Sequence, residues 1–192
     1  MTITTTRRIA LAVAAGSTLV LGVIAASGSA SAITQRDTTP RGWVNVETCT
    51  SFSGAVNVMP GLRKKARVES AVVSGTLDGC SFEGQSQPGQ GSFTATVSGS
   101  ASVTAGTLTG TFTANWPSSS GLNPSNGNVT ITTTSAGHYT VSGSVTSGAL
   151  VGTSLSSGYV VTGTQGSGSK KSPIVEQNFV NTASFILGRN GG

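Results

Sequence analysis

The sequence predicts an all-β protein, and three observations carry this prediction. Ser and Thr together make up roughly 30% of the chain, and the good helix formers Glu, Lys and Gln are scarce. Thr and Val are β-branched, so they pack well on pleated strands. Apolar and polar residues alternate over several stretches, with turn signals at about every 8–12 residues. We therefore expect an antiparallel β-sandwich of roughly nine strands, with a closed antiparallel β-barrel as the alternative.

The first 32 residues have the features of an export signal. Arg7 and Arg8 precede an apolar run over residues 9–26, and a small-residue box ends at Ala32. We expect cleavage after Ala32, with a retained membrane anchor as the alternative. After cleavage we expect no stable membrane insertion and a secreted protein, extracellular or associated with the cell wall. The expected parts are a signal peptide (1–32), a polar lead-in (33–42) and a single all-β domain (43–192).

Turn residues divide the first half of this domain. Pro presets the first corner of a turn and Gly tolerates positive φ at the next, so Met59-Pro60-Gly61 is predicted to be a turn. Asp78-Gly79 is expected to end a strand just before Cys80. The strands expected here are residues 43–49, 55–59 and 67–77.

Strict alternation marks the second half. Over residues 107–116, Leu108, Phe112 and Trp116 share one set of alternate positions, and the other set is almost entirely Thr. This pattern is typical of a strand with one buried and one wet face, so Trp116 is expected in the core. The other strands expected are residues 93–97, 128–134, 139–146, 149–154, 159–164 and 175–187. Loops are expected at residues 86–91, 117–127 and 166–172, the last carrying Lys170 and Lys171.

The chain has two cysteines, Cys49 and Cys80. An exported chain with two cysteines most simply pairs them, so we expect a disulfide. The alternatives are a redox pair or half of a metal site. The wide spacing, the lack of a CxxC motif and the single histidine disfavour both. Closing this loop would remove roughly 3–4 kcal/mol of unfolded-state entropy.

The charge balance is mildly basic. The formal charge of +5 would fall to +3 after cleavage, with nine basic and six acidic residues left. This is too little for a nucleic-acid-binding surface, but it favours attraction to an anionic cell wall or membrane surface. The basic cluster Arg63, Lys64, Lys65 and Arg67 is therefore a candidate docking site for polyanions such as wall polymers or acidic lipid. The alternative roles are protection of a strand edge and simple solubility.

Signals for catalysis are weak. His138 is the sole histidine and no GxSxG motif is present, which leaves little support for a serine hydrolase. Glu47 and Glu69 both lie in expected strands and could face one another across a sheet, which would give the paired carboxylates that glycosidases use. Solvated charges on a strand face are the interpretation that we favour. Clusters with metal-ligand spacing and nucleotide-binding loops are missing, so we assign no cofactor, metal or catalytic residue.

The chain resembles a set of small, β-rich secreted proteins of actinobacteria. The resemblance is carried by Cys49, the run Met59-Pro60-Gly61-Leu62, Arg67, Gly79-Cys80 and Trp116. It implies export and a β fold and assigns no activity.

The function that these observations favour is a non-catalytic extracellular binding or cell-surface-associated protein, with anionic wall polymers as the expected partner and no nucleic acid. The alternatives are an extracellular glycoside-cleaving hydrolase and a small inhibitory or structural protein. A hydrolase would need a concave pocket with convergent ionisable groups, whereas a binding module would show a flat patch or a charged edge.

Overall fold

The computed structural model describes residues 43–190, all within one unit of the chain, Thr38–Gly192. The expected signal segment, the Ala32 cleavage site and the polar lead-in lie outside the described residues. Nine strands are present: β1 (Trp43–Leu62), β2 (Arg67–Phe82), β3 (Gln85–Gln87), β4 (Gly91–Ala101), β5 (Gly106–Asn115), β6 (Ser125–Ser135), β7 (His138–Gly148), β8 (Ser154–Gln165) and β9 (Ile174–Asn190). Within this range the single helical segment is a 3-10 turn, η1 (Ser118–Ser120).

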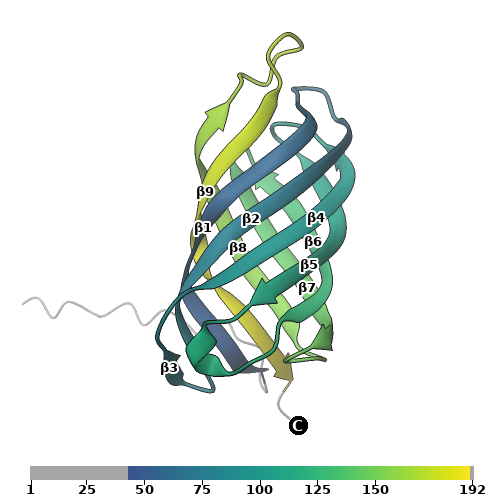
Figure 1. The fold of residues 1–192 in the computed structure, drawn as a ribbon. Helices are drawn as coiled ribbons and strands as arrows, with labels where there is room; N and C mark the ends of the chain where they lie inside the picture. The colour runs from purple at the N-terminus through teal and green to yellow at the C-terminus, as the bar shows by residue number, and fades with distance from the viewer. Residues whose placement is uncertain (1–42, 191–192) are drawn as a thin grey trace, which may run out of the picture. The chain divides into compact units, whose positions relative to one another are not determined.

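The strands form one antiparallel sheet that closes on itself. The order is β1-β9-β8-β7-β6-β5-β4-β2-β3, and β1 also pairs with β2, so eight strands form a barrel and β3 adds to β2 (Figure 1). The expectation of an all-β antiparallel fold with about nine strands is confirmed. The expectation of a sandwich is wrong, and the alternative, a closed barrel, is correct.

Closure follows from the length and pairing of β1. This strand of 20 residues pairs with β2 from Glu47 to Met59 and with β9 from Trp43 to Leu62, so neither of its edges is left open. Gly54 of β1 lies opposite Gly75 of β2, and a Cβ at Gly54 would overlap the carbonyl of Ser74. The two glycines therefore let the neighbouring strands bend closely past each other.

Turn signals that lie inside long strands explain the wrong expectation of a sandwich, because they make each long strand look like two short ones in the sequence. Met59-Pro60-Gly61 lies within β1 and is not a turn, although Gly61 does have a positive φ of 106°. The chain reverses at residues 63–66 instead. Asp78-Gly79 lies within β2, and residues 149–153 form a turn and not a strand. Strands interrupted in the sequence pattern are thus continuous in the fold, long enough to coil round a barrel.

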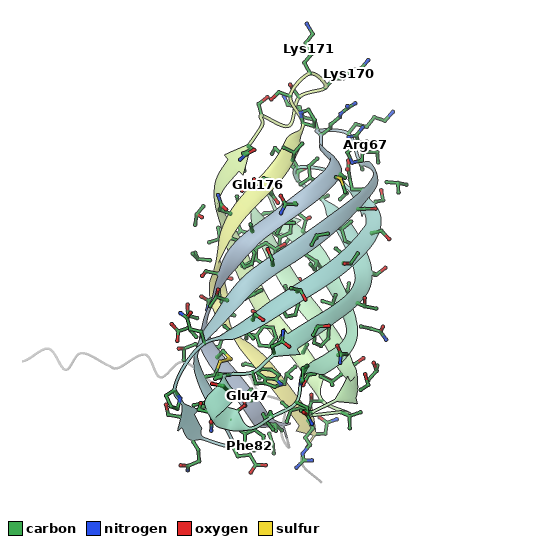
Figure 2. All side chains as sticks on the ribbon, viewed as in Figure 1. Glu47, Arg67, Phe82, Lys170, Lys171 and Glu176 are labelled. Carbon is green, nitrogen blue, oxygen red and sulfur yellow. A yellow bond between two sulfur atoms is a disulfide. The ribbon has the colours of Figure 1, made fainter. Side chains whose placement is uncertain are left out.

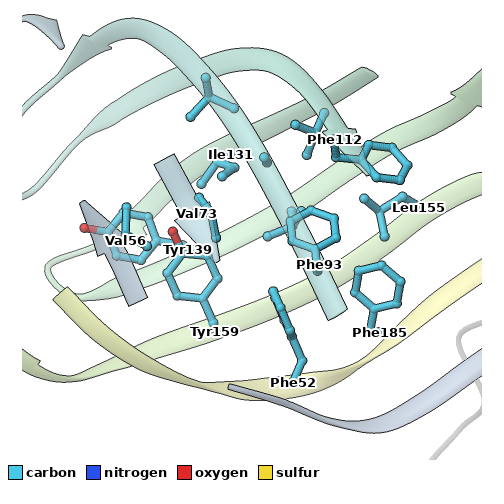
Figure 3. Packing of buried hydrophobic residues seen from close by; sticks show 14 of the residues in the cluster. Phe52, Val56, Val73, Phe93, Phe112, Ile131, Tyr139, Leu155, Tyr159 and Phe185 are labelled. Carbon is cyan, nitrogen blue, oxygen red and sulfur yellow. The ribbon is translucent and has the colours of Figure 1, made fainter. Parts of the chain in front are cut away.

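Side chains fill the barrel interior. Leu108, Phe112 and Trp116 are buried as expected, and the threonines between them face outward or are partly exposed. Phe52 packs edge-on against Phe93, with ring centroids 5.4 Å apart (Figure 3). It packs in the same way against Phe179, with ring centroids 4.9 Å apart. Tight aromatic packing of this kind leaves the described barrel with a core and no open channel.

The expected disulfide is present. Cys49 and Cys80 are direct partners across the β1–β2 ladder, and both are buried. The bond lies toward the end of the barrel where the described chain begins and ends. Trp116 closes the same end: its indole N–H donates to Ser125 Oγ at 3.0 Å, and that hydroxyl donates to the carbonyl of Ala149 at 2.5 Å.

Candidate functional site

The basic cluster predicted from the sequence lies at the β1–β2 hairpin turn. Lys64 and Lys65 are exposed at the turn, whereas Arg63 and Arg67 are half-buried on either side of it. The turn lies at the end of the barrel opposite to the disulfide, as Figure 2 shows for Arg67 and Glu47. The cluster is therefore at the tip of a hairpin and not along a sheet edge, so edge protection is not its role.

A second loop brings two more cations to this end. Lys170 and Lys171 lie in the β8–β9 loop, both exposed (Figure 2). The amide of Lys64 donates to the carbonyl of Gly168 in that loop at 3.1 Å. We name the six cations the basic end: Arg63, Lys64, Lys65, Arg67, Lys170 and Lys171.

The basic end surrounds a cleft. An open cleft of about 410 Å³ is lined by Arg63, Lys64, Lys65, Gly168, Ser169 and Lys170. The β4–β5 loop supports it, because the amide of Val103 donates to the carbonyl of Arg63 at 3.0 Å. More than 100 residues separate the two groups of cations, so only the closed barrel places them together. No local signal in the sequence could have found this association.

Arg67 differs from the other five cations. Its Nε lies 2.7 Å from Glu69 Oε1, and its Nη2 donates to the carbonyl of Gly61 at 2.8 Å. Glu69 Oε2 accepts the amide of Gly61 at 3.0 Å. This is the one ion pair within residues 43–190. Arg67 therefore stabilises the hairpin, and the five remaining cations of the basic end have no ion pair among the described residues.

Charge is segregated between the two ends of the barrel. At the basic end, the described acidic residues are Glu69, which is ion-paired, and Glu176, which is half-buried on β9. At the other end lie Glu47, Asp78 and Glu83, with Arg189. Among the described residues, the acidic side chains other than Glu69 and Glu176 thus lie at the end of the barrel opposite to the basic end.

The interior beneath the basic end offers no ligand site. Its cavity measures about 20 Å³, room for about one water molecule and far below the size of organic-ligand pockets. The Tyr139 hydroxyl donates to Gln177 Oε1 at 3.1 Å inside it. Burial raises the pKa of Tyr139, which the Gln177 hydrogen bond partly offsets, and burial also raises the pKa of Tyr159. Both phenols are therefore neutral core groups at ordinary pH.

The two glutamates weighed as a catalytic pair do not meet. Glu47 pairs with Phe82 and Ser70 with Met59, which sets Glu47 and Glu69 about 13 residues apart along one ladder, roughly 40 Å at the usual rise per strand residue. Glycosidase carboxylates stand about 5–9.5 Å apart. His138 is exposed at the start of β7. Glu47 and Glu69 therefore do not form the carboxylate pair considered for glycoside cleavage.

Glu47 is an unusual group nonetheless. It is fully buried, and neither carboxylate oxygen has a hydrogen-bond partner among the described residues. Burial raises its pKa to about 7. Its carboxylate and the sulfurs of Cys49 and Cys80 lie within 4.8 Å of one another. The sulfurs are bonded to each other, so one carboxylate alone is left to act as a metal ligand.

Across residues 43–190, no helix is both long enough and apolar enough to cross a membrane. Comparisons with protein-family models, curated proteins and solved structures find no significant match for this chain.

Proposed function

We propose that this protein is an exported, non-catalytic β-barrel that docks on polyanions, such as anionic cell-wall polymers, through its basic end. The observation that carries the proposal is the gathering of six cations from two distant segments, the β1–β2 hairpin and the β8–β9 loop, of which Arg67 alone is in an ion pair. Free lysine and arginine side chains around an open cleft attract phosphate or carboxylate groups.

The shape of the site favours a polymer over a small molecule. The cleft is open, its polar groups are at the tips of loops, and the barrel interior beneath it is filled. Such a site provides several exposed charges and few directed hydrogen bonds. It suits a chain of repeated anionic groups, bound with strong salt dependence and modest chemical selectivity.

Export fits the same proposal. The buried Cys49–Cys80 disulfide is compatible with an oxidising compartment, and the sequence of residues 1–32 predicts a signal. The positive end would then face anionic polymers at the cell surface.

The test is binding of the purified protein to immobilised wall polymer and to inorganic polyphosphate over a series of salt concentrations. Replacing Lys64, Lys65, Lys170 and Lys171 by Ser should weaken binding at least tenfold at about 0.15 M salt and flatten its salt dependence. Arg189→Ser, which removes an exposed cation at the other end, is the control and should leave binding unchanged. Equal binding by the quadruple variant would overturn the proposal.

A further inference from the structure

Exposed apolar side chains gather next to the basic end. Seven large apolar residues are exposed within the described chain, and four of them form what we call the apolar patch: Met59, Val68, Val72 and Val175, with 69%, 77%, 44% and 42% of their surface exposed. They come from β1, β2 and β9. The patch therefore spans three neighbouring strands of the barrel wall.

The ladder register places these side chains together. Met59 pairs with Ser70, so it lies between Val68 and Val72, which flank Ser70 on the outer face of β2. Side chains at such diagonal positions are about 7–8 Å apart and within reach of each other. Val175 of β9 lies beside Gly61 of β1, because a Cβ placed on Gly61 would be 3.0 Å from Val175 Cγ1. Met59, Val68 and Val72 thus share the outer face of the β1–β2 ladder, and Val175 lies beside Gly61 on the neighbouring strand β9.

The apolar patch borders the cations in sequence and in space. Met59 precedes Arg63 by four residues, Val68 follows Arg67 directly, and Val175 follows Lys171 by four. Long, unpaired basic side chains and exposed apolar ones therefore share one end of the barrel. A hydrated polymer satisfies the charges but gives Met59 and Val68 nothing to pack against.

We propose that the partner of this end is an anionic lipid surface. The lysines would contact lipid head groups, while the apolar patch would enter the boundary between head groups and acyl chains, about 5–10 Å deep. The patch is on the outer wall of the barrel, where Val72 borders a shallow hollow of about 110 Å³ and Met59 and Val68 project into solvent. Such a surface suits a deformable lipid leaflet better than a shaped protein partner. This inference rests on the proposed function, because it uses the same cations.

The experiment compares vesicles with a soluble polyanion. The protein is cosedimented with phosphatidylcholine vesicles, with and without phosphatidylglycerol, and its binding to inorganic polyphosphate is measured in parallel. Of the two kinds of vesicle, we expect the protein to bind only those that contain phosphatidylglycerol. The double variant Met59→Thr/Val68→Thr should lose at least fivefold in vesicle binding and keep its binding to polyphosphate. Both residues are exposed on strands, where Thr is well tolerated. Thermal unfolding of each variant is measured as the check that the fold is kept.

Val151→Thr is the matched control, because Val151 is 64% exposed in a turn at the other end. It should bind vesicles like the parent protein. Unchanged vesicle binding by Met59→Thr/Val68→Thr would overturn the lipid inference and leave polyanion docking intact. Loss of polyphosphate binding in Met59→Thr/Val68→Thr would also count against the lipid inference. A dimer in sedimentation velocity that this variant dissociates would assign the patch to a second copy of the chain instead.

Discussion

Arg67 and Glu69 hold the backbone of Gly61 from two sides. Arg67 donates to the Gly61 carbonyl, Glu69 accepts from the Gly61 amide, and the two side chains are ion-paired at 2.7 Å. All three residues belong to the β1–β2 hairpin that carries four of the six cations of the basic end. Glu69 is fully buried, so this arrangement fixes the hairpin from within the barrel.

Glu69→Gln should therefore destabilise the protein. The substitution removes the ion pair and leaves the partly buried Arg67 without a counter-charge, a change that costs about 2–4 kcal/mol. Urea unfolding at pH 7 measures it. Glu176→Gln, at a half-buried position on β9, is the control and should stay within about 0.5 kcal/mol of the parent.

Arg67 and Lys65 should separate into a structural and a binding residue. Arg67 donates from Nε to Glu69 and from Nη2 to the Gly61 carbonyl, whereas Lys65 is exposed at the turn. We expect Arg67→Ser to lower the free energy of unfolding by at least about 1.5 kcal/mol. Lys65→Ser should leave stability unchanged and weaken polyphosphate binding about two- to fivefold at low salt. The reverse assignment of the two effects would contradict this division.

The sequence alone predicts well which face of a strand is buried, but it predicts poorly whether the sheet closes into a barrel. Alternation of Phe112 and Trp116 with threonines identifies a buried face, since side-chain direction in a strand is a local property. Whether the first and last strands pair depends on contacts between β1 and β9, which lie more than 100 residues apart. Pro60 and Gly79 are also residue types typical of turns, yet both lie inside long strands.

The sequence likewise predicts only part of the candidate site. The cluster from Arg63 to Arg67 is contiguous and is visible in the sequence, but its association with Lys170 requires the barrel. The internal role of Arg67 depends on Gly61 and Glu69 and has no local signature. Glu47 and Glu69 do not meet, because the hairpin pairs their strands with the two residues at opposite ends. The expectation that both are solvated charges on a strand face is also wrong, because both side chains are buried.

The disulfide should contribute a few kcal/mol of stability. Cys49 and Cys80 are 31 residues apart, and closing a loop of this length restricts the unfolded chain by about 3–4 kcal/mol. The double variant Cys49→Ala/Cys80→Ala should lose that amount in guanidinium unfolding while keeping its β-sheet circular dichroism. An unchanged unfolding midpoint would show that the bond adds nothing to the pairing of β1 with β2.

Glu47 should make stability fall as pH rises. Burial raises the pKa of this carboxyl to about 7, above its ordinary 4.5, so the folded state binds more protons than the unfolded state between these values. Stability from this group is full below pH 4.5 and decreases by about 3 kcal/mol as pH rises through 7. A buried carboxylate without a hydrogen-bond partner among the described residues explains the direction, because ionisation there is not compensated.

Glu47→Gln tests this directly, since the amide keeps the shape and cannot ionise. We expect the variant to match the parent near pH 4.5 and to unfold at a higher urea concentration at pH 8, with the difference growing between these values. Glu83→Gln removes an exposed carboxylate near the same end of the barrel and should follow the parent at every pH. A variant that is less stable than the parent at pH 8 would mean that the Glu47 carboxylate is ionised and stabilised in the folded barrel.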